Sequence, residues 1–359
     1  MIDRRRRALL GGLAGLPLTT LTTLTTLTTL AGCGSEPTFR EAGFSVFGQI
    51  WTLRFADTPA EQINAAVRAA EHIVEPLYRR LHPWRDSELT RLNRQLAERG
   101  EAVSSPDIRA LIRAARPLFE ASDGRFDPSI GGLIGLWGFH RDAGDTPITP
   151  PAESALDAWL ADAPSLDDVR IEGDRVIASH PRVQFDFNAL AEGFAAEQVL
   201  DAIEAVGITN CLLDSGGDLY TLGHAGGRDW RLGIRDPQGR DALGGVRVSG
   251  RRALCSSGDY ERRLRYRGKS FGHIIDPLTA RPARHNTGTT VLGRDPVIAD
   301  GAATALMLLS PSEAKRFAGQ VGLDGILLVT ENGRPWRDAG MQSAMSTTPA
   351  GRSIDWHSF

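Results

Sequence analysis

The feature that most restricts the fold of this chain is the irregular order of its strand and helix patterns from residue 183 onward. A β-rich run, Val183 to Phe187, meets a helical pattern, Ala191 to Ile203, after a short turn of mostly small residues. Further patterns follow without βαβ alternation, with strands at 210–213, 230–235, 252–256 and 289–292 and helices at 300–309 and 312–321. The order predicts an α+β fold with mixed or antiparallel sheets and packed helices, rather than a doubly wound α/β fold.

The first half of the chain is predicted to hold one strand and three helices. Phe44 to Phe55 alternates as a strand does. Thr58-Pro59-Ala60-Glu61 has the residues of a capping box, which predicts a helix that kinks or ends at Pro76. Two further helices are predicted over 87–97 and 106–121, and residues 141–182 are predicted to be mostly loop.

The first 33 residues have the layout of an export signal. A start rich in arginine precedes an apolar stretch and a Leu-Thr-Thr repeat, and Leu30-Ala31-Gly32-Cys33 is similar to a bacterial lipobox. The alternative is a transmembrane anchor, but the segment is too rich in threonine for a comfortable span. We expect an exported protein, lipid-anchored at Cys33 and facing the periplasm, and the early arginines also resemble a twin-arginine signal. A tether over 34–43, a folded domain over 44–337 and a loose tail over 338–359 would follow.

Composition and missing motifs exclude several function classes. A net charge of −3, with no basic stripe interleaved with aromatics, gives no support for nucleic-acid binding. The chain has no Gly-x-Gly-x-x-Gly after a strand, and in "RLRYRGKS" Arg263 stands where a P-loop requires glycine. Apart from Cys33, only Cys211 and Cys255 occur, and they form either one disulfide or two buried thiols.

Asp300 and Thr304 are candidate ligands of a divalent cation. Their spacing of four places both side chains on one face of a helix, about one turn apart. Carboxylate and hydroxyl oxygens suit a hard ion such as Mg²⁺, which completes its octahedron with water and substrate phosphate. The competing interpretation is structural, with Asp300 as an N-cap and Thr304 bonding to the preceding turn.

The turn between the run at 183 and its helix raises a question of charge. Small residues there let a ligand approach backbone N–H groups, which favours an anion, yet Asp186 and Glu192 lie beside them. A phosphate that carries a metal ion would resolve this conflict. His273, in "GHIIDP", is a candidate base or a residue that orders the next turn, and Asp127, in "RFDP", could equally be a turn residue.

Seven motifs in this order resemble those of the bacterial FAD:protein FMN transferases, the ApbE family. They are "DSELTRLN", "GRFDPSIGGLIGLWGF", "FDFNALAEGFAAE", "LLDSGGDLY", "SSGDY", "HIIDP" and "ADGAATAL", and they cover the chain from about Phe44 to Gly333. The resemblance implies a two-lobed α+β domain related to the T-fold. It also implies a Mg²⁺-dependent enzyme that splits FAD, attaches FMN to a threonine or serine of a partner protein and releases AMP.

The resemblance also assigns site residues. Metal contacts fall on Asp300, Thr304 and the backbone of Ala189, while Ala303 replaces a second acid of some relatives. Contacts to the flavin nucleotide fall on Phe47, Trp84, Arg125, Phe126, Asp127, Asp186, Glu192 and Ile274. Trp84 stands where the family usually has tyrosine, and the assignment of Phe47 rests on a motif that this chain matches poorly. We assign the role of general base to His273 as a hypothesis.

Two other functions use the same residues. Attack by water instead of a protein hydroxyl would make the protein a FAD pyrophosphatase, and loss of chemistry would leave a lipid-anchored flavin-binding protein. Family habit suggests a membrane electron-transport subunit as the acceptor. The sequence does not identify that acceptor.

Overall fold

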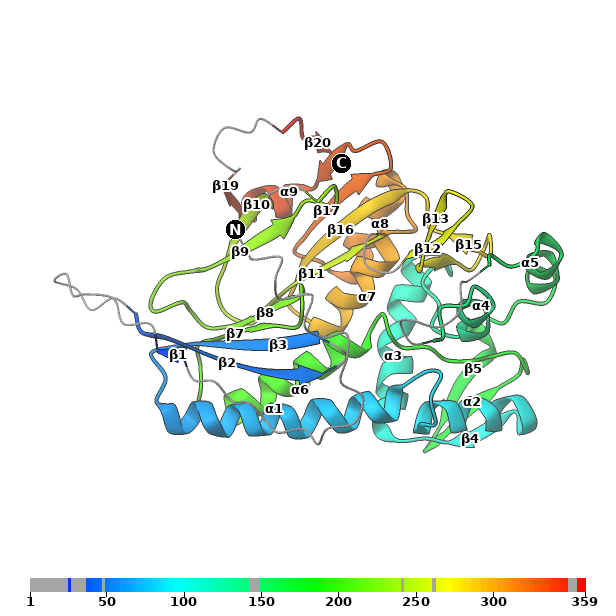
Figure 1. Cartoon of the computed structure of the whole chain (residues 1–359), viewed down its shortest axis with the longest axis horizontal. Coiled ribbons are helices and arrows are strands. Elements are labelled where there is room, and N and C mark those ends of the chain that lie inside the picture. Colours follow the sequence, from blue (N-terminus) through cyan, green and yellow to red (C-terminus); the bar gives the residue numbers. More distant parts are fainter. Residues whose placement is uncertain are drawn as a thin grey trace.

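The computed structural model describes residues 25–26, 37–46, 49–141, 149–239, 242–259, 263–347 and 354–359. Within them, one large sheet forms the centre of the molecule, and all but one of its strand pairs are antiparallel (Figure 1). Its strands, in spatial order, are β1 (Thr25–Thr26), β2 (Phe39–Val46), β3 (Gln49–Ala56), β7 (Cys211–Asp214), β8 (Leu219–Leu222), β11 (Arg252–Gly258), β16 (Asn286–Gly293), β17 (Gly325–Thr330), β18 (Pro335–Arg337) and β20 (His357–Ser358). The parallel pair is β18 with β20. This arrangement confirms the predicted α+β class with mixed and antiparallel sheets.

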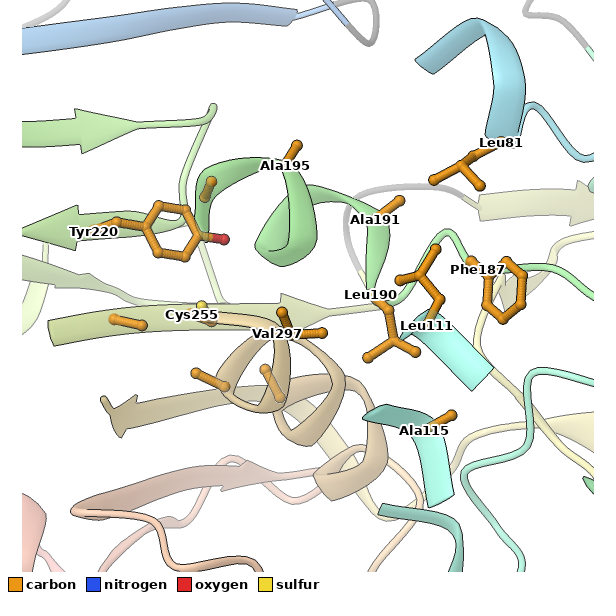
Figure 2. Close-up of a cluster of buried hydrophobic side chains, with 14 of the residues drawn as sticks. Leu81, Leu111, Ala115, Phe187, Leu190, Ala191, Ala195, Tyr220, Cys255 and Val297 are labelled. Carbon is orange, nitrogen blue, oxygen red and sulfur yellow. The ribbon is translucent and has the colours of Figure 1, made fainter. Parts of the chain in front are cut away.

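Helices cover one face of the large sheet, and α1 runs along its lower edge in Figure 1. The helices are α1 (Ala60–Leu81), α6 (Ala191–Ala205), α7 (Pro296–Leu306) and α8 (Pro311–Val321). Figure 2 shows the core beneath them, where Ala195 of α6 and Val297 of α7 lie near Tyr220 and Cys255 of the sheet. Small side chains dominate α6 and α7, so the two helices pack closely over the strands.

A smaller three-stranded sheet covers the opposite face. It consists of β19 (Met345–Thr347), β10 (Ala242–Val248) and β9 (Trp230–Arg235), and the short helix α9 (Ala339–Ala344) packs beside it. The large sheet has an apolar core on each face, and successive side chains along a strand point to opposite faces. Cys255 packs under the helices, and its neighbour Leu254 packs under the small sheet. β17 is buried on both faces, which explains why its sequence is a continuous apolar run.

The large sheet with its covering helices and the small sheet form the first lobe, and the remaining elements form what we call the second lobe. The second lobe contains most of the short elements. Its helices are α2 (Glu88–Arg99), α3 (Pro106–Ala121), α4 (Gly131–Leu136), α5 (Glu153–Leu160) and the 3-10 turn η2 (Leu166–Asp168). Its strands are β4 (Glu101–Val103), β5 (Val169–Glu172), β6 (Arg175–Ala178), β12 (Arg263–Tyr266), β13 (Lys269–Gly272), β14 (Ile275–Asp276) and β15 (Arg281–Pro282). A separate apolar cluster joins Trp137, Trp159 and Leu264, so the β12–β13 hairpin packs against α4 and α5 (Figure 1).

The first three helices begin in different ways. Ser87 and Ser105 cap α2 and α3, so α2 begins one residue after its predicted start at 87. Thr58 does not cap α1, because its hydroxyl donates to the carbonyl of Ala56 and Pro59 occupies the cap position. The helix also continues past Pro76 to Leu81, so of the two predicted outcomes at that proline, a kink or an end, the end is excluded.

The expected strand at 183–187 is also wrong. Only Gln184 forms a bridge, with Ile130, and the rest of the run is irregular. The Asn93 side chain takes the place of a neighbouring strand, since its Nδ2 donates to the Phe185 carbonyl and its Oδ1 accepts from the Phe185 N–H, at 2.9 and 2.8 Å. The backbone polar groups of this buried run are thus satisfied without a sheet.

The predicted tether and tail need correction where the structure describes them. Residues 39–43 belong to β2, so an ordered strand begins inside the predicted tether. The predicted loose tail contains α9, β19 and β20, and Trp336 stacks on His357 at the edge of the large sheet. Two-residue pairings such as β18 with β20 have too little periodicity to be read from sequence.

Cys211 and Cys255 are two separate buried thiols, which decides between the alternatives that the sequence left open. Burial raises the pKa of both thiols, so neither is a reactive thiolate. No helix in the described ranges is long and apolar enough to span a bilayer.

Candidate active site

A cavity of about 700 Å³ opens between the helix-covered sheet and the second lobe. This volume is in the range of ligand pockets. The residues that line it include eleven of the sequence-predicted site residues: Trp84, Arg125, Phe126, Asp127, Asp186, Ala189, Glu192, His273, Ile274, Asp300 and Thr304. The structure therefore brings together residues that are more than 200 positions apart in the chain.

The remaining two assignments cannot be placed relative to the cavity. Phe47 and Cys33 lie outside the described residues, so their predicted roles stay predictions.

Glu192 lies in the first turn of α6, at the centre of the cavity wall. Its carboxylate accepts from Gln49 Nε2 at 3.1 Å and from the Ser215 hydroxyl at 3.3 Å. Gly216, which follows Ser215 in the chain, has φ +95°. A Cβ added to Gly216 would lie 1.7 Å from the Gln49 amide oxygen. Glycine is therefore required there, and the "DSGGD" turn forms part of the cavity wall.

The close contact between α6 and α7 positions Asp300. A Cβ on Gly193 would lie 2.3 Å from the Pro296 carbonyl oxygen and 2.8 Å from Asp300 Cβ, so only glycine permits this approach. The Asp300 carboxylate, buried in the structure, accepts from the Gly193 N–H at 2.8 Å. Thr304 follows one turn later, and its hydroxyl shares a hydrogen bond with the Ser257 hydroxyl at 3.1 Å.

The structural alternative for Asp300 as an N-cap is wrong. Asp295 caps α7, because its Oδ1 accepts from the N–H groups of Val297 and Ile298. The helix therefore begins at Pro296, one turn before the predicted start. Proline at the first helical position was the sequence signal for this earlier start.

The donor set fits a hard divalent cation. Asp300, Thr304 and Ala189 line one cavity and offer a carboxylate, a hydroxyl and a backbone carbonyl. Magnesium takes few protein oxygens and completes its shell with water and phosphate. In the described part of the chain, no group of three His, Cys, Asp or Glu residues is arranged to hold a metal, so a zinc-type centre is not supported there.

His140, Trp84 and the buried Asp186 form a contact group in the second lobe. His140 Nε2 lies 2.8 Å from Asp186 Oδ2, and the other carboxylate oxygen accepts from the Asn188 N–H at 2.9 Å. The imidazole also stacks on Trp84, with ring centroids 5.6 Å apart and an angle of 23°. His140 thus holds both the acid and the aromatic ring that were predicted to contact the flavin nucleotide.

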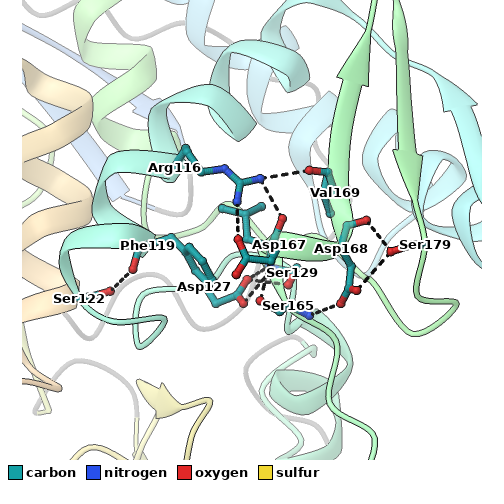
Figure 3. Close-up of polar contacts among 11 residues, drawn as sticks. Arg116, Phe119, Ser122, Asp127, Ser129, Ser165, Asp167, Asp168, Val169 and Ser179 are labelled. Carbon is teal, nitrogen blue, oxygen red and sulfur yellow. Dashed lines mark hydrogen bonds and ion pairs between the residues drawn. The ribbon is translucent and has the colours of Figure 1, made fainter.

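Asp127 is engaged by its own lobe, as Figure 3 shows. Its Oδ1 accepts from the N–H and hydroxyl of Ser129 at 2.8 and 2.6 Å, and its Oδ2 accepts from the Leu166 N–H at 3.0 Å. Burial raises the pKa of Asp127 to about 6, against the lowering effect of these hydrogen bonds and of Arg116. These contacts support the turn interpretation, in which Asp127 fixes the shape of the cavity wall.

Arg125 and Phe126 complete the wall next to α8. Arg125 forms an ion pair with Glu313 at 3.1 Å, and Phe126 is buried. The turn before them places Asp123 and Gly124 at positive φ, which directs the chain sharply into the cavity.

His273 follows β13 directly and lines the cavity beside Ile274. Its ring meets Phe139 edge-on, with centroids 6.3 Å apart. The Asp276 carboxylate orders the following turn by accepting from the Leu278 N–H, so this turn has an internal support other than His273. The position of His273 is compatible with the role of a base toward a ligand in the cavity.

Sequence reasoning missed several supporting residues. Gln49, Ser215, Ser257 and His140 hold Glu192, Thr304 and Asp186, yet none was predicted. Ser215 and Ser257 lie in the motifs "LLDSGGDLY" and "SSGDY", and His140 directly follows "WGF", so local patterns marked their neighbourhoods. The partners of all four residues are distant in the chain, so no local pattern showed what they hold.

Comparisons with known proteins identify the family of this chain. The ApbE family model matches residues 47–327. The FAD:protein FMN transferase of Rhodobacter capsulatus is 34% identical over 312 residues, covering 86% of this chain and 58% of that protein. The chain thus spans less than two thirds of that relative. The enzyme of the same name from Salmonella typhimurium is 30% identical over 254 residues, covering 68% of this chain and 71% of that protein.

Solved structures show the same fold. The ApbE protein of Thermotoga maritima aligns with a TM-score of 0.76 at 23% identity, covering 86% of this chain and 100% of that chain. The flavin transferase ApbE of Vibrio cholerae aligns with a TM-score of 0.72 at 24% identity, covering 86% and 99%.

Proposed function

The chain belongs to the ApbE family of flavin transferases, and from this we propose that it transfers the FMN half of FAD to a protein hydroxyl and releases AMP. The acceptor is a threonine or serine of an exported or membrane electron-transport protein. The observation that carries the proposal is the single cavity in which Asp300, Thr304, Ala189 and His273 lie together with the predicted nucleotide-binding residues.

The reaction forms one bond and breaks one bond. The acceptor oxygen attacks the phosphorus of the FMN half, and the bond from that phosphorus to the bridging oxygen breaks, so AMP leaves with the bridging oxygen. The hydroxyl proton passes to the His273 imidazole, which acts as the general base. Positioning does most of the remaining work in such phosphoryl transfers.

Different residues are expected to contact different parts of the substrate. Trp84 offers an aromatic face, and Asp186 and Glu192 are acceptors for N–H or ribose hydroxyl donors. Asp300, Thr304 and the Ala189 carbonyl would hold Mg²⁺ near the pyrophosphate. A bound Mg²⁺ supplies neutralisation of the charge that develops on the phosphate oxygens. This ion resolves the conflict between an anionic ligand and a turn that carries two carboxylates.

The proposal includes a location. The signal-like start and Cys33 support export followed by lipid anchoring at the periplasmic face, where a tethered enzyme would reach membrane electron-transport subunits. The motif at Leu30-Ala31-Gly32-Cys33 is the basis for this part of the proposal. Labelling cells with a radioactive fatty acid tests it, and a Cys33→Ala chain that still takes up the label would contradict it.

The activity is tested by incubating the purified protein with FAD, Mg²⁺ and a threonine-bearing acceptor, followed by mass spectrometry of the acceptor. A mass gain of one FMN with release of AMP is the expected result. Free FMN plus AMP would instead identify a FAD pyrophosphatase, and intact FAD would identify a binding protein. His273→Gln is expected to slow transfer by about 10²- to 10⁴-fold, the usual contribution of a general base. Full transfer by this variant would refute the base role.

A further inference from the structure

The motif "RLRYRGKS", which resembled the end of a P-loop, forms an isolated β-hairpin. β12 and β13 pair only with each other, with Tyr266 opposite Lys269. Arg267 and Gly268 form the connection, both at positive φ, +47° and +76°. Two successive residues at positive φ are typical of a type I′ hairpin turn. The segment is therefore not a phosphate loop, and its four cations need another explanation.

Apolar side chains anchor the hairpin to the second lobe, while its basic side chains are exposed to solvent. Leu264 is buried in the second-lobe cluster, and Phe271 and Tyr266 pack against the same cluster. Phe271 lies 5.6 Å from the Trp137 ring, centroid to centroid. Arg265, Arg267 and Lys269 are exposed. We call these three residues the basic hairpin.

The charges of the basic hairpin have no ion-pair partner within the described ranges. Arg263, earlier in β12, forms an ion pair with Asp259 at 2.6 Å. Among the residues that the structure describes, no carboxylate lies within ion-pair distance of Arg265, Arg267 or Lys269. The whole chain has a net charge of −3, so this local positive charge opposes the overall balance.

The chain lines the candidate active site both shortly before and directly after the hairpin. Ser257, near the end of β11, lines the cavity, and so does His273, directly after β13. Arg263 is paired with Gly272, the neighbour of His273. Arg265 lies two residues further along the strand, about 7 Å at ~3.4 Å per residue. An acceptor segment that brings its hydroxyl to His273 would therefore pass close to the basic hairpin.

We propose that the basic hairpin docks an acidic segment of the acceptor protein next to its flavinylated threonine or serine. This inference rests on the proposed function, since it names the chemistry of that partner. Complementary charge at the rim of an interface raises the rate of encounter and selects the partner. An anionic membrane is the less favoured occupant, because lipid-binding segments typically carry four to eight basic residues and this set has three.

The test compares two synthetic peptides, each with one threonine, flanked by aspartates in one and by asparagines in the other. FMN attachment is followed by mass spectrometry and AMP release by chromatography, with the full-length protein at low and high salt. Wild-type protein is expected to prefer the aspartate peptide about tenfold in kcat/KM at low salt and to lose the preference near 1 M salt, where screening is strong. Equal use of the two peptides, or labelling of neither while AMP is released, overturns the proposal.

Three variants separate charge from structure. Arg265→Gln, Arg267→Gln and Lys269→Gln together should remove the preference but leave the KM for FAD and the release of AMP without peptide unchanged. The matched control is Arg94→Gln, Arg99→Gln and Arg113→Gln, three exposed residues of α2 and α3 that do not line the cavity and should leave the preference intact. Arg265→Lys with Arg267→Lys keeps the charge and should keep the preference.

Other outcomes contradict the proposal in distinguishable ways. A hairpin variant with a raised KM for FAD and an intact peptide preference would show that the cations attract the dinucleotide. A variant that loses binding to phosphatidylserine vesicles but keeps the preference would show a membrane contact. Absence of AMP release and of FMN transfer in every form of the protein contradicts the proposed function itself, and the docking proposal with it.

Discussion

The candidate active site and the basic hairpin are neighbours in the chain but use charge in opposite ways. In the site, Asp300, Asp186 and Asp127 are buried and their oxygens accept hydrogen bonds from backbone or side-chain donors. In the hairpin, Arg265 and Lys269 are exposed. Buried charges are expensive unless they are compensated, so they are held in fixed geometry, whereas exposed charges are screened and adaptable.

This difference indicates a division of labour. A fixed set of buried oxygens suits a substrate and an ion of constant shape, such as the FAD and divalent cation of the proposed function. Exposed cations on a separately anchored hairpin suit a protein partner whose local sequence varies. Substitutions in the first region are expected to affect every reaction of FAD, and substitutions in the second only the reaction with acceptor.

The largest effect is expected for Asp300→Asn. Loss of this carboxylate should lower FMN transfer and FAD hydrolysis together by about 10³-fold, roughly 4 kcal/mol, because a metal ion contributes several kcal/mol to charge stabilisation. The Mg²⁺ concentration for half-maximal rate should also rise. Asp295→Asn is the matched control, since it alters the cap of the same helix without touching the cavity. If Asp300→Asn had normal rates and a normal Mg²⁺ requirement, the result would contradict the assignment of Asp300 as a metal ligand.

The next effect concerns Asp127 and pH. The folded protein keeps a proton at Asp127 up to about pH 6, whereas the unfolded chain releases it near 3.8. Protonated Asp127 therefore stabilises the fold fully below about pH 4, and this contribution is lost as pH rises through 6. The free energy of unfolding of the wild type relative to Asp127→Asn should fall by about 2.4 kcal/mol from pH 4 to pH 7.

Urea unfolding of both forms without FAD measures this dependence. Because asparagine does not titrate, the two curves of stability against pH should approach or cross between pH 4 and pH 7. Parallel curves would mean that Asp127 titrates alike in the folded and unfolded states, and that its burial has no consequence for stability.

A smaller effect is expected for His140→Phe. The substitution keeps an aromatic ring on Trp84 but removes the 2.8 Å hydrogen bond to Asp186. The KM for FAD should rise about tenfold, close to 1.5 kcal/mol, with a smaller change in kcat, as expected for loss of one hydrogen bond to a charged group. His180→Phe is the control, because its partner Asp162 lies outside the cavity. Equal effects of the two substitutions would argue against a positioning role for His140.

The smallest effect sharpens the comparison within the hairpin. Arg265→Gln alone should raise the KM for the aspartate peptide about two- to threefold at low salt, the scale of a single surface charge. Arg263→Gln should change it less, because Asp259 already neutralises Arg263. A larger effect at Arg263 than at Arg265 would reverse the assignment of the docking charges.

Prediction from sequence succeeded where local patterns were sufficient. The spacing of Asp300 and Thr304 placed both on one helix face, and the helices predicted over 87–97 and 106–121 lie close to the observed α2 and α3. It failed where a distant partner decides the structure. Nothing local shows that the Asn93 side chain replaces a strand beside Phe185, or that residues after 338 return to the edge of the large sheet.

The sequence by itself determined the class of fold, the family and eleven of the residues around the cavity, because periodicity and motifs are local properties of the chain. Only the tertiary structure decided which groups support those residues, that the two buried thiols stay apart, and that the cations after Asp259 form an outward-facing hairpin. The physical reason is that hydrogen-bond partners, burial and the direction of a side chain depend on elements brought together from distant parts of the chain.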